Sequence, residues 1–182
     1  MRRILIAAVL TVMQLPLFGQ NMSVSTNLAD YAMLGTFNAG ASVSVARHWS
    51  LDAAVKYNPF KYGEDNNIKQ YRQRMVNVGA RWWPWYVFSG WWVSGKAQYQ
   101  EFTMGGFVSE ETSEGDRYGG NFSAGYSYMI GKHLNMDFGL GMWGGYEKYV
   151  TYACPRCGAI VDEGEKYFIL PSDIIVSLTY IF

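Results

Sequence analysis

The sequence is poor in cysteine, histidine and proline, and it has no excess of basic charge. Its 182 residues include 2 Cys, 2 His and 5 Pro, and its 15 Lys and Arg balance 15 Asp and Glu. Nucleic-acid binding needs clustered positive charge, so the balance gives no basis for that function. Two Cys allow at most one disulfide, which excludes a scaffold held together by many bridges.

Long hydrophobic runs are also missing beyond the N-terminus. A membrane-spanning helix needs about 18 or more apolar residues, and no later segment approaches that length. At the N-terminus, Arg2 and Arg3 precede a short apolar run over residues 4–18, and polar residues begin at Gln20. This arrangement is typical of a secretory signal. We therefore expect a cleaved signal peptide over 1–20 and one domain over 21–182.

The remaining chain is rich in aromatic residues and glycine, and apolar and polar positions alternate along it. Aromatics make up 17% of the sequence and Gly occurs 20 times. Alternation with a period of two predicts β-strands, each with one apolar face. The predicted strands cover residues 22–32, 37–45, 51–58, 76–82, 91–100, 118–130, 134–142 and 172–182.

Eight strands of this kind predict an all-β fold, an eight-stranded antiparallel up-and-down transmembrane β-barrel. An even number of strands brings both termini to one end, which would be the periplasmic side of a bacterial outer membrane. Short turns at 47–49, 84–89 and 131–133 would share that side. Loops at 33–36, 59–72, 103–117 and 147–171 would face outward, and this asymmetry is typical of such barrels.

Aromatic residues gather near both predicted ends, as interfacial belts require. At the periplasmic ends they are Trp49, Trp82, Trp83, Trp85, Tyr86, Phe88, Trp91, Trp92, Tyr180 and Phe182, and at the outer ends Tyr57, Phe60, Tyr62, Tyr99, Phe102, Tyr118, Tyr146 and Tyr149.

With apolar faces outward, the charged residues of the strands should point into the lumen. The expected lumen network consists of Asp52, Lys56, Arg81, Lys96 and Asp137, together with Glu101 and Glu147. Eight strands enclose a space just wide enough for side chains, so these charges should pair rather than line a pore.

Nothing in the sequence forms a recognisable catalytic or metal site, and no cofactor is expected. His48 and His133 both fall in predicted turns at one end. The pair Cys154 and Cys157 in Cys-Pro-Arg-Cys-Gly is the one sharp motif, and it is open to three interpretations: a loop disulfide, a metal site completed by other ligands, or a redox pair. An oxidising exterior favours the disulfide.

Several segments together resemble a known family. They are TNLADYAMLG, RHWSLDAAVKYNPF, QRMVNVGARWW, GYSYMIGKHLNMDFGLGMWGGYEKY, ACPRCG and SLTYIF. The chain resembles a domain-of-unknown-function family of eight-stranded outer-membrane barrels from Bacteroides-type bacteria, similar to OmpA-like barrels and often encoded beside fimbrial or surface-polysaccharide proteins. The resemblance implies no enzymatic activity.

The resemblance also implies a role for the last strand and a set of partners. Outer-membrane barrels are recognised by the barrel-assembly machinery through a closing strand that ends in an aromatic carboxylate, here with Tyr180 and Phe182. Other expected partners are outer-membrane lipids, lipopolysaccharide and fimbrial or polysaccharide-system proteins. The expected function is structural or surface-interacting. The alternative is an outer-leaflet lipid-binding or lipid-modifying enzyme.

Overall fold

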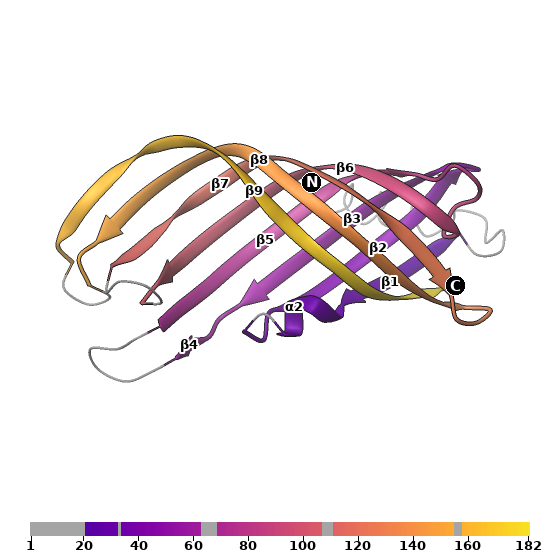
Figure 1. Cartoon of the computed structure of the whole chain (residues 1–182), viewed down its shortest axis with the longest axis horizontal. Helices are drawn as coiled ribbons and strands as arrows, with labels where there is room; N and C mark the ends of the chain where they lie inside the picture. The colour runs from indigo at the N-terminus through magenta and orange to yellow at the C-terminus, as the bar shows by residue number, and fades with distance from the viewer. Residues whose placement is uncertain (1–20, 33, 63–68, 107–110, 155–157) are drawn as a thin grey trace, which may run out of the picture.

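The chain forms a closed antiparallel β-barrel, which we describe from a computed structural model covering residues 21–182 except 33, 63–68, 107–110 and 155–157 (Figure 1). The expected signal peptide, residues 1–20, lies outside the described residues. The elements in chain order are β1 (Met22–Asn27), α2 (Leu28–Ala32), β2 (Phe37–Ala46), β3 (Trp49–Asn58), β4 (Lys61–Tyr62), β5 (Lys69–Trp82), β6 (Gly90–Gly105), β7 (Thr112–Met129), β8 (Leu134–Tyr152) and β9 (Ile160–Ile181).

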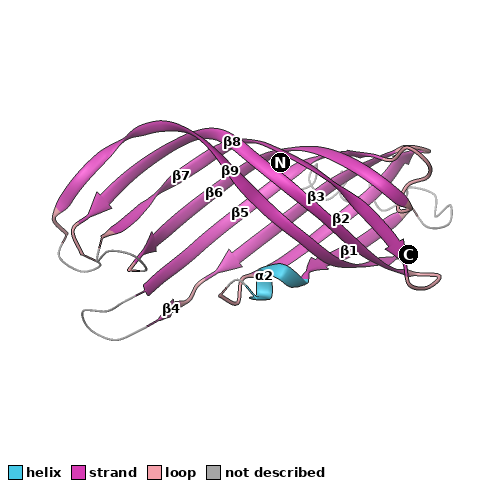
Figure 2. Cartoon of the chain, in the orientation of Figure 1, coloured by secondary structure: helices cyan, strands magenta, loops and turns pink. Residues whose placement is uncertain are grey.

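The predicted eight-stranded barrel is confirmed. Each long strand pairs antiparallel with its neighbour in the chain, and β1 closes the ring by pairing with β9. β4 is a two-residue extension that pairs only with the start of β5, so it adds no wall of its own (Figure 2). No helix in the described part of the chain is long and apolar enough to cross a membrane.

The polarity of the barrel is the reverse of that of a soluble protein. Leu140 and Phe122 face outward and are 69% and 64% exposed, whereas Asn121 and Ser123 face inward and are both 3% exposed. This follows from the period-two alternation of the strands, since successive side chains point to opposite faces. The apolar faces therefore lie on the outside and the polar faces fill the lumen.

We call the end that holds Phe182 the C-terminal end and the opposite end the hairpin end. At the hairpin end the strands run much further than the sequence predicts. Most of the segments 103–117 and 147–171, and residues 69–72 of the segment 59–72, were expected as loops but are extensions of β5 to β9. Over much of these extensions the alternation is hidden because polar side chains occur on both faces, although residues 167–170 of β9 are apolar. What forms the strands there is backbone pairing with their neighbours. In Figure 1 these strands project past β1, β2 and β3.

The first predicted strand, 22–32, is wrong in its second half. β1 ends at Asn27, and α2 follows it. The Asn27 side chain accepts a hydrogen bond from the amide of Ala29 at 3.3 Å, which is the geometry of a helix cap. This cap competes with strand pairing and turns the chain out of the sheet.

Three aromatics assigned to the periplasmic belt instead lie inside the barrel. Trp83, Phe88 and Trp92 pack with Ile181 into an apolar plug at the C-terminal end, and each is almost completely buried. Phe102, assigned to the outer belt, is buried as well. Trp92 and Phe102 fall on inward positions of β6, whereas Trp83 and Phe88 lie in the connection between β5 and β6 and are buried in the barrel. Trp49, Trp82, Trp85, Tyr86 and Trp91 are exposed, as the belt requires.

Candidate functional site

The part of the lumen nearest the C-terminal end holds a compact group of buried charges. Arg81 lies 2.9 Å from Asp52 and 3.4 Å from Asp137, and Lys96 lies 3.7 Å from Asp52. These four residues come from β3, β5, β6 and β8. The Arg81 guanidinium also lies over the ring of Trp92, 4.2 Å from its centroid. The structure thus brings four residues of the expected network into one cluster next to the apolar plug.

Lys56, the fifth residue, joins a second cluster with two carboxylates that the sequence analysis did not identify. Its Nζ lies 3.0 Å from Asp30 in α2 and 2.6 Å from Asp173 in β9. Asn121 donates a hydrogen bond to the other Asp173 oxygen at 3.0 Å. Asp30 was not identified because it fell in the second half of the predicted strand 22–32. The sequence Asn27-Leu28-Ala29-Asp30 nevertheless carries a helix-start signal. Asp173 lies beside a β-bulge that only the β8–β9 register reveals.

The charges within each of these clusters neutralise one another. Buried ions stay ionised only when paired and hydrogen-bonded, and each charge here has an opposite charge within 4 Å. A partly open space of about 250 Å³ lies beside Lys56 and Asp30, between α2 and the inward faces of β5, β6, β7, β8 and β9. Trp143 lines this space and is buried.

A third ion pair occupies the lumen at the hairpin end. Arg117 donates to Glu147 at 2.7 Å, and its guanidinium lies 3.9 Å from the ring centroid of Phe102. Glu101, which was expected in the lumen, faces outward and lies 3.8 Å from Arg74. That expectation is wrong because β6 runs to Gly105 without a bulge, so odd-numbered residues stay on the outer face.

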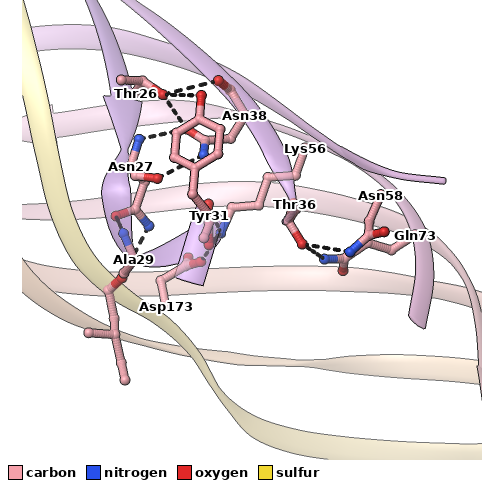
Figure 3. Close-up of polar contacts among 12 residues, drawn as sticks. Thr26, Asn27, Ala29, Tyr31, Thr36, Asn38, Lys56, Asn58, Gln73 and Asp173 are labelled. Atoms are coloured by element: carbon pink, nitrogen blue, oxygen red, sulfur yellow. Dashed lines mark hydrogen bonds and ion pairs between the residues drawn. The ribbon is translucent and has the colours of Figure 1, made fainter. Parts of the chain in front are cut away.

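Where β1 ends, side-chain hydrogen bonds connect the neighbouring strands of the barrel wall. We call this place the seam (Figure 3). The Asn27 side chain donates to the carbonyl of Ile174 at 3.1 Å and accepts from the amide of Val176 at 2.9 Å. On its other side, the Asn38 side chain accepts from the Asn27 amide at 2.6 Å and donates to the Asn27 carbonyl at 2.8 Å. The two side-chain amides therefore replace backbone amides between β9, β1 and β2.

α2 packs against β9 beside the seam, and Asp30 anchors it to the lumen through Lys56. Thr36 accepts a hydrogen bond from Asn58 at 3.0 Å and thereby ties the end of the α2–β2 connection to β3. The sequence showed Asn27 only as a polar position, because its partners Ile174 and Val176 lie in a strand almost 150 residues away.

The side chains of both histidines contact backbone carbonyls at the C-terminal end. His48 Nδ1 lies 3.0 Å from the carbonyl of Trp83, and His133 Nδ1 lies 2.9 Å from the carbonyl of Ile181. The ring of His133 stacks on Tyr180, whose ring meets Phe182 edge-on. The Phe182 amide donates to the carbonyl of Met22 at 2.9 Å, so the last residue takes part in closing the ring.

Cys154 follows the end of β8 at the tip of the hairpin end, and it is disulfide-bonded. Cys157 lies outside the described residues, so the pairing between the two remains a prediction. Within the described ranges, no three His, Cys, Asp or Glu side chains are grouped in a way that could hold a metal ion.

Comparisons with known proteins give a family and nothing more specific. Neither the curated proteins nor the solved structures contain a match to this chain. One family model matches residues 4–182, which is nearly the whole chain. The chain belongs to the family described as protein of unknown function, DUF3575.

Proposed function

We propose that the protein is an integral outer-membrane barrel with a structural or surface-interaction role. The observation that carries the proposal is the reversed polarity of the closed barrel. Exposed side chains such as Phe122 and Leu140 lie outside while Asp52, Asn121 and Asp137 are buried inside. A barrel of this kind satisfies all its backbone groups in hydrocarbon because its strands pair with each other, and it presents an apolar surface to lipid.

The orientation that we propose has both termini in the periplasm. Supporting it, Met22 and Phe182 lie at one end together with the short connections at 47–48 and 130–133. Above the outward ring of Tyr99, Tyr118 and Tyr146, the outer face of the hairpin end becomes charged, with pairs such as Lys148 and Glu165 at 2.8 Å. Tyrosines followed by charges are expected where a membrane meets water.

The hairpin end would then face the exterior and contact a fimbrial, glycan or membrane-protein partner or lipopolysaccharide. Tyr180 and Phe182 would present the signal read by the barrel-assembly machinery. The role that we propose is non-enzymatic. Both histidines contact backbone carbonyls at the C-terminal end, which supports a structural role for them.

Heat modifiability together with membrane fractionation tests the proposal. The full chain should co-sediment with outer membranes, resist carbonate extraction, and migrate faster in SDS before boiling than after it, because a closed barrel resists SDS. A periplasmic protein released by osmotic shock, with one mobility under both conditions, would contradict it.

Lipid binding is the second candidate, and one feature favours it. Phe122, Leu140, Met142 and Ile174 line an outward groove of about 520 Å³ beside the bulge in β9. An apolar groove of this size fits part of an acyl chain. Native mass spectrometry from lipid nanodiscs should then retain lipid on the wild type and lose it in Leu140→Ser, whereas Leu51→Ser, on the far side of the barrel, should retain it.

A further inference from the structure

The space of about 250 Å³ in the lumen lies where the wall of the barrel is lowest on one side. There β1, β2 and β3 reach only to Asn27, Phe37 and Asn58, whereas β5 to β9 run further (Figure 1). Asp30 and Thr36 line the space from the low side, and the inward faces of β5 to β9 line it from the high side. We call this space the mouth chamber. The mouths of β-barrels are frequent places for small-molecule sites.

The charged groups of the mouth chamber already have partners. Lys56 lies 3.0 Å from Asp30 and 2.6 Å from Asp173, and Arg117 lies 2.7 Å from Glu147. A charged ligand would have to break one of these pairs or stay unpaired in a poorly solvated place, and both are costly. The mouth chamber therefore favours a ligand without net charge.

Uncharged hydrogen-bonding groups of the same chamber are only partly used. The indole N–H of Trp143 is buried and has no acceptor in the described chain. Gln98 accepts from Asn121 through its oxygen, and Gln100 donates to Gln73 through its nitrogen. The opposite end of each of these two amides, the Gln98 nitrogen and the Gln100 oxygen, bonds to no described residue. All three side chains are at most 5% exposed, so they suit a ligand that carries both donors and acceptors.

Apolar side chains form the rest of the lining. Met75, Met104 and Leu170 line the chamber together with Trp143. A matching ligand has hydroxyl groups for the amides and the indole N–H, and C–H surface for the methionines. A sugar ring combines both around one small frame. The volume of about 250 Å³ lies below the roughly 300–1,000 Å³ of pockets for drug-sized ligands, so a single ring is the appropriate size.

The lining is held in place by the barrel wall. Gln100 is paired with Met75 in the β5–β6 ladder, and Trp143 is paired with Asn121 and Leu170 in the ladders on either side of β8. The ring of Trp143 also meets that of Phe168 edge-on, with centroids 4.8 Å apart. Side chains that are already ordered lose little conformational entropy on binding, so the chamber is preorganised.

We propose that the mouth chamber binds one uncharged sugar ring, either free or at the end of a glycan. Its hydroxyl groups would bond to Gln98, Gln100 and Trp143, and its C–H face would lie toward Met75 and Met104. The inference rests on the proposed function, because the hairpin end must face the exterior for a glycan to reach the chamber. It gives the surface-interaction role a ligand class and a place. One ring makes few contacts, so the affinity should be in the millimolar range.

The test uses the full-length barrel in nanodiscs without lipopolysaccharide. The probes are glucose, galactose, mannose, fucose, N-acetylglucosamine and N-acetylgalactosamine. Saturation-transfer difference NMR detects binding, and titration gives the Kd. We expect saturable binding of at least one of these sugars. A trisaccharide with that sugar at its non-reducing end separates the two sources, since equal affinity indicates the free sugar and tighter binding indicates the end of a glycan.

Two variants locate the site, each with a matched control on the outer wall. Met104→Trp fills the mouth chamber and should abolish binding, whereas Met129→Trp, at an exposed position, should not change it. Trp143→Phe keeps a ring but removes the indole donor, and it should weaken binding about threefold to tenfold. Trp91→Phe, also exposed, should leave the affinity unchanged. Heat modifiability of each variant verifies that its barrel is folded.

Binding that survives Met104→Trp, or that Trp91→Phe weakens as much as Trp143→Phe does, would place the sugar outside the mouth chamber and overturn the inference. Absence of saturable binding to a folded barrel would also overturn it, as would stronger binding of acetate or tetramethylammonium under the same conditions. Both ends of the barrel are accessible in a nanodisc, so this assay does not depend on orientation in cells. Failure of outer-membrane fractionation would instead overturn the proposed function, and the two failures are distinguishable.

Discussion

At the scale of single residues, Lys56 matters most because two buried carboxylates depend on it. Lys56→Met would remove the cation that lies 3.0 Å from Asp30 and 2.6 Å from Asp173, and losing one partner of a buried pair costs about 3–5 kcal/mol. We expect a loss of unfolding free energy in that range, measured by urea titration of tryptophan fluorescence in lipid vesicles. Lys69→Met, at an exposed position, is the control. Equal effects of the two variants would show that the cluster does not stabilise the barrel.

Tyr152 gives a pH-dependent prediction at the hairpin end. Its hydroxyl donates to Glu114 at 2.9 Å, and this hydrogen bond raises the pKa of Tyr152. A raised folded pKa means that the stabilisation is fully present below the unfolded pKa of about 10 and is lost as pH rises through the folded value. Absorbance titration of tyrosinate should therefore lose one late-titrating group in Tyr152→Phe. Tyr128→Phe, on the outer wall, should keep it.

At the scale of the strand, the Asn27 side chain bonds to β9 at the seam, where β1 has already ended. Asn27→Ala removes two hydrogen bonds to the β9 backbone and the cap of α2, and each unsatisfied backbone group costs about 1–3 kcal/mol if it stays dry. Amide exchange at Val176 should become faster in this variant by hydrogen-exchange mass spectrometry. Ser25→Ala in the same strand should leave that amide protected, and unchanged exchange in Asn27→Ala would contradict the bridging role.

At the scale of the whole molecule, assembly and stability should separate at Phe182. The side chain is 57% exposed, and burial of one ring contributes at most about 1.5–3 kcal/mol, so its deletion should hardly alter the stability of the folded barrel. We expect insertion in cells to fall sharply while refolding in vitro persists. Quantitative immunoblots of outer-membrane fractions measure the first and heat modifiability measures the second. Normal membrane levels of the truncated chain would exclude the assembly signal.

The orientation of the whole barrel can be tested at Cys154 and Cys157. If the hairpin end is extracellular and the cysteines are bridged, a membrane-impermeant maleimide should label intact cells only after a reductant is added. Since the bridge closes a very short loop, Cys→Ser variants should still insert. Labelling that requires cell lysis would place the hairpin end in the periplasm.

The sequence by itself determined the closed eight-stranded barrel and its polarity. Alternation alone decides which face of each strand is apolar, so Phe122 and Asn121 could be assigned to opposite faces without any tertiary information. The inward positions of Asp52, Lys56 and Arg81 followed from the same rule. The rule also predicts Glu101 outward once β6 is known to continue without a bulge.

Only the tertiary structure decided where the strands end and what joins them. Strand length at the hairpin end depends on neighbouring backbones, because over much of that region polar side chains occur on both faces and give no clear period-two signal. The seam depends on Asn27 meeting β9 at the other end of the chain. β9 extends far beyond the end of β1, and this difference in length is a property of their pairing and not of either segment alone.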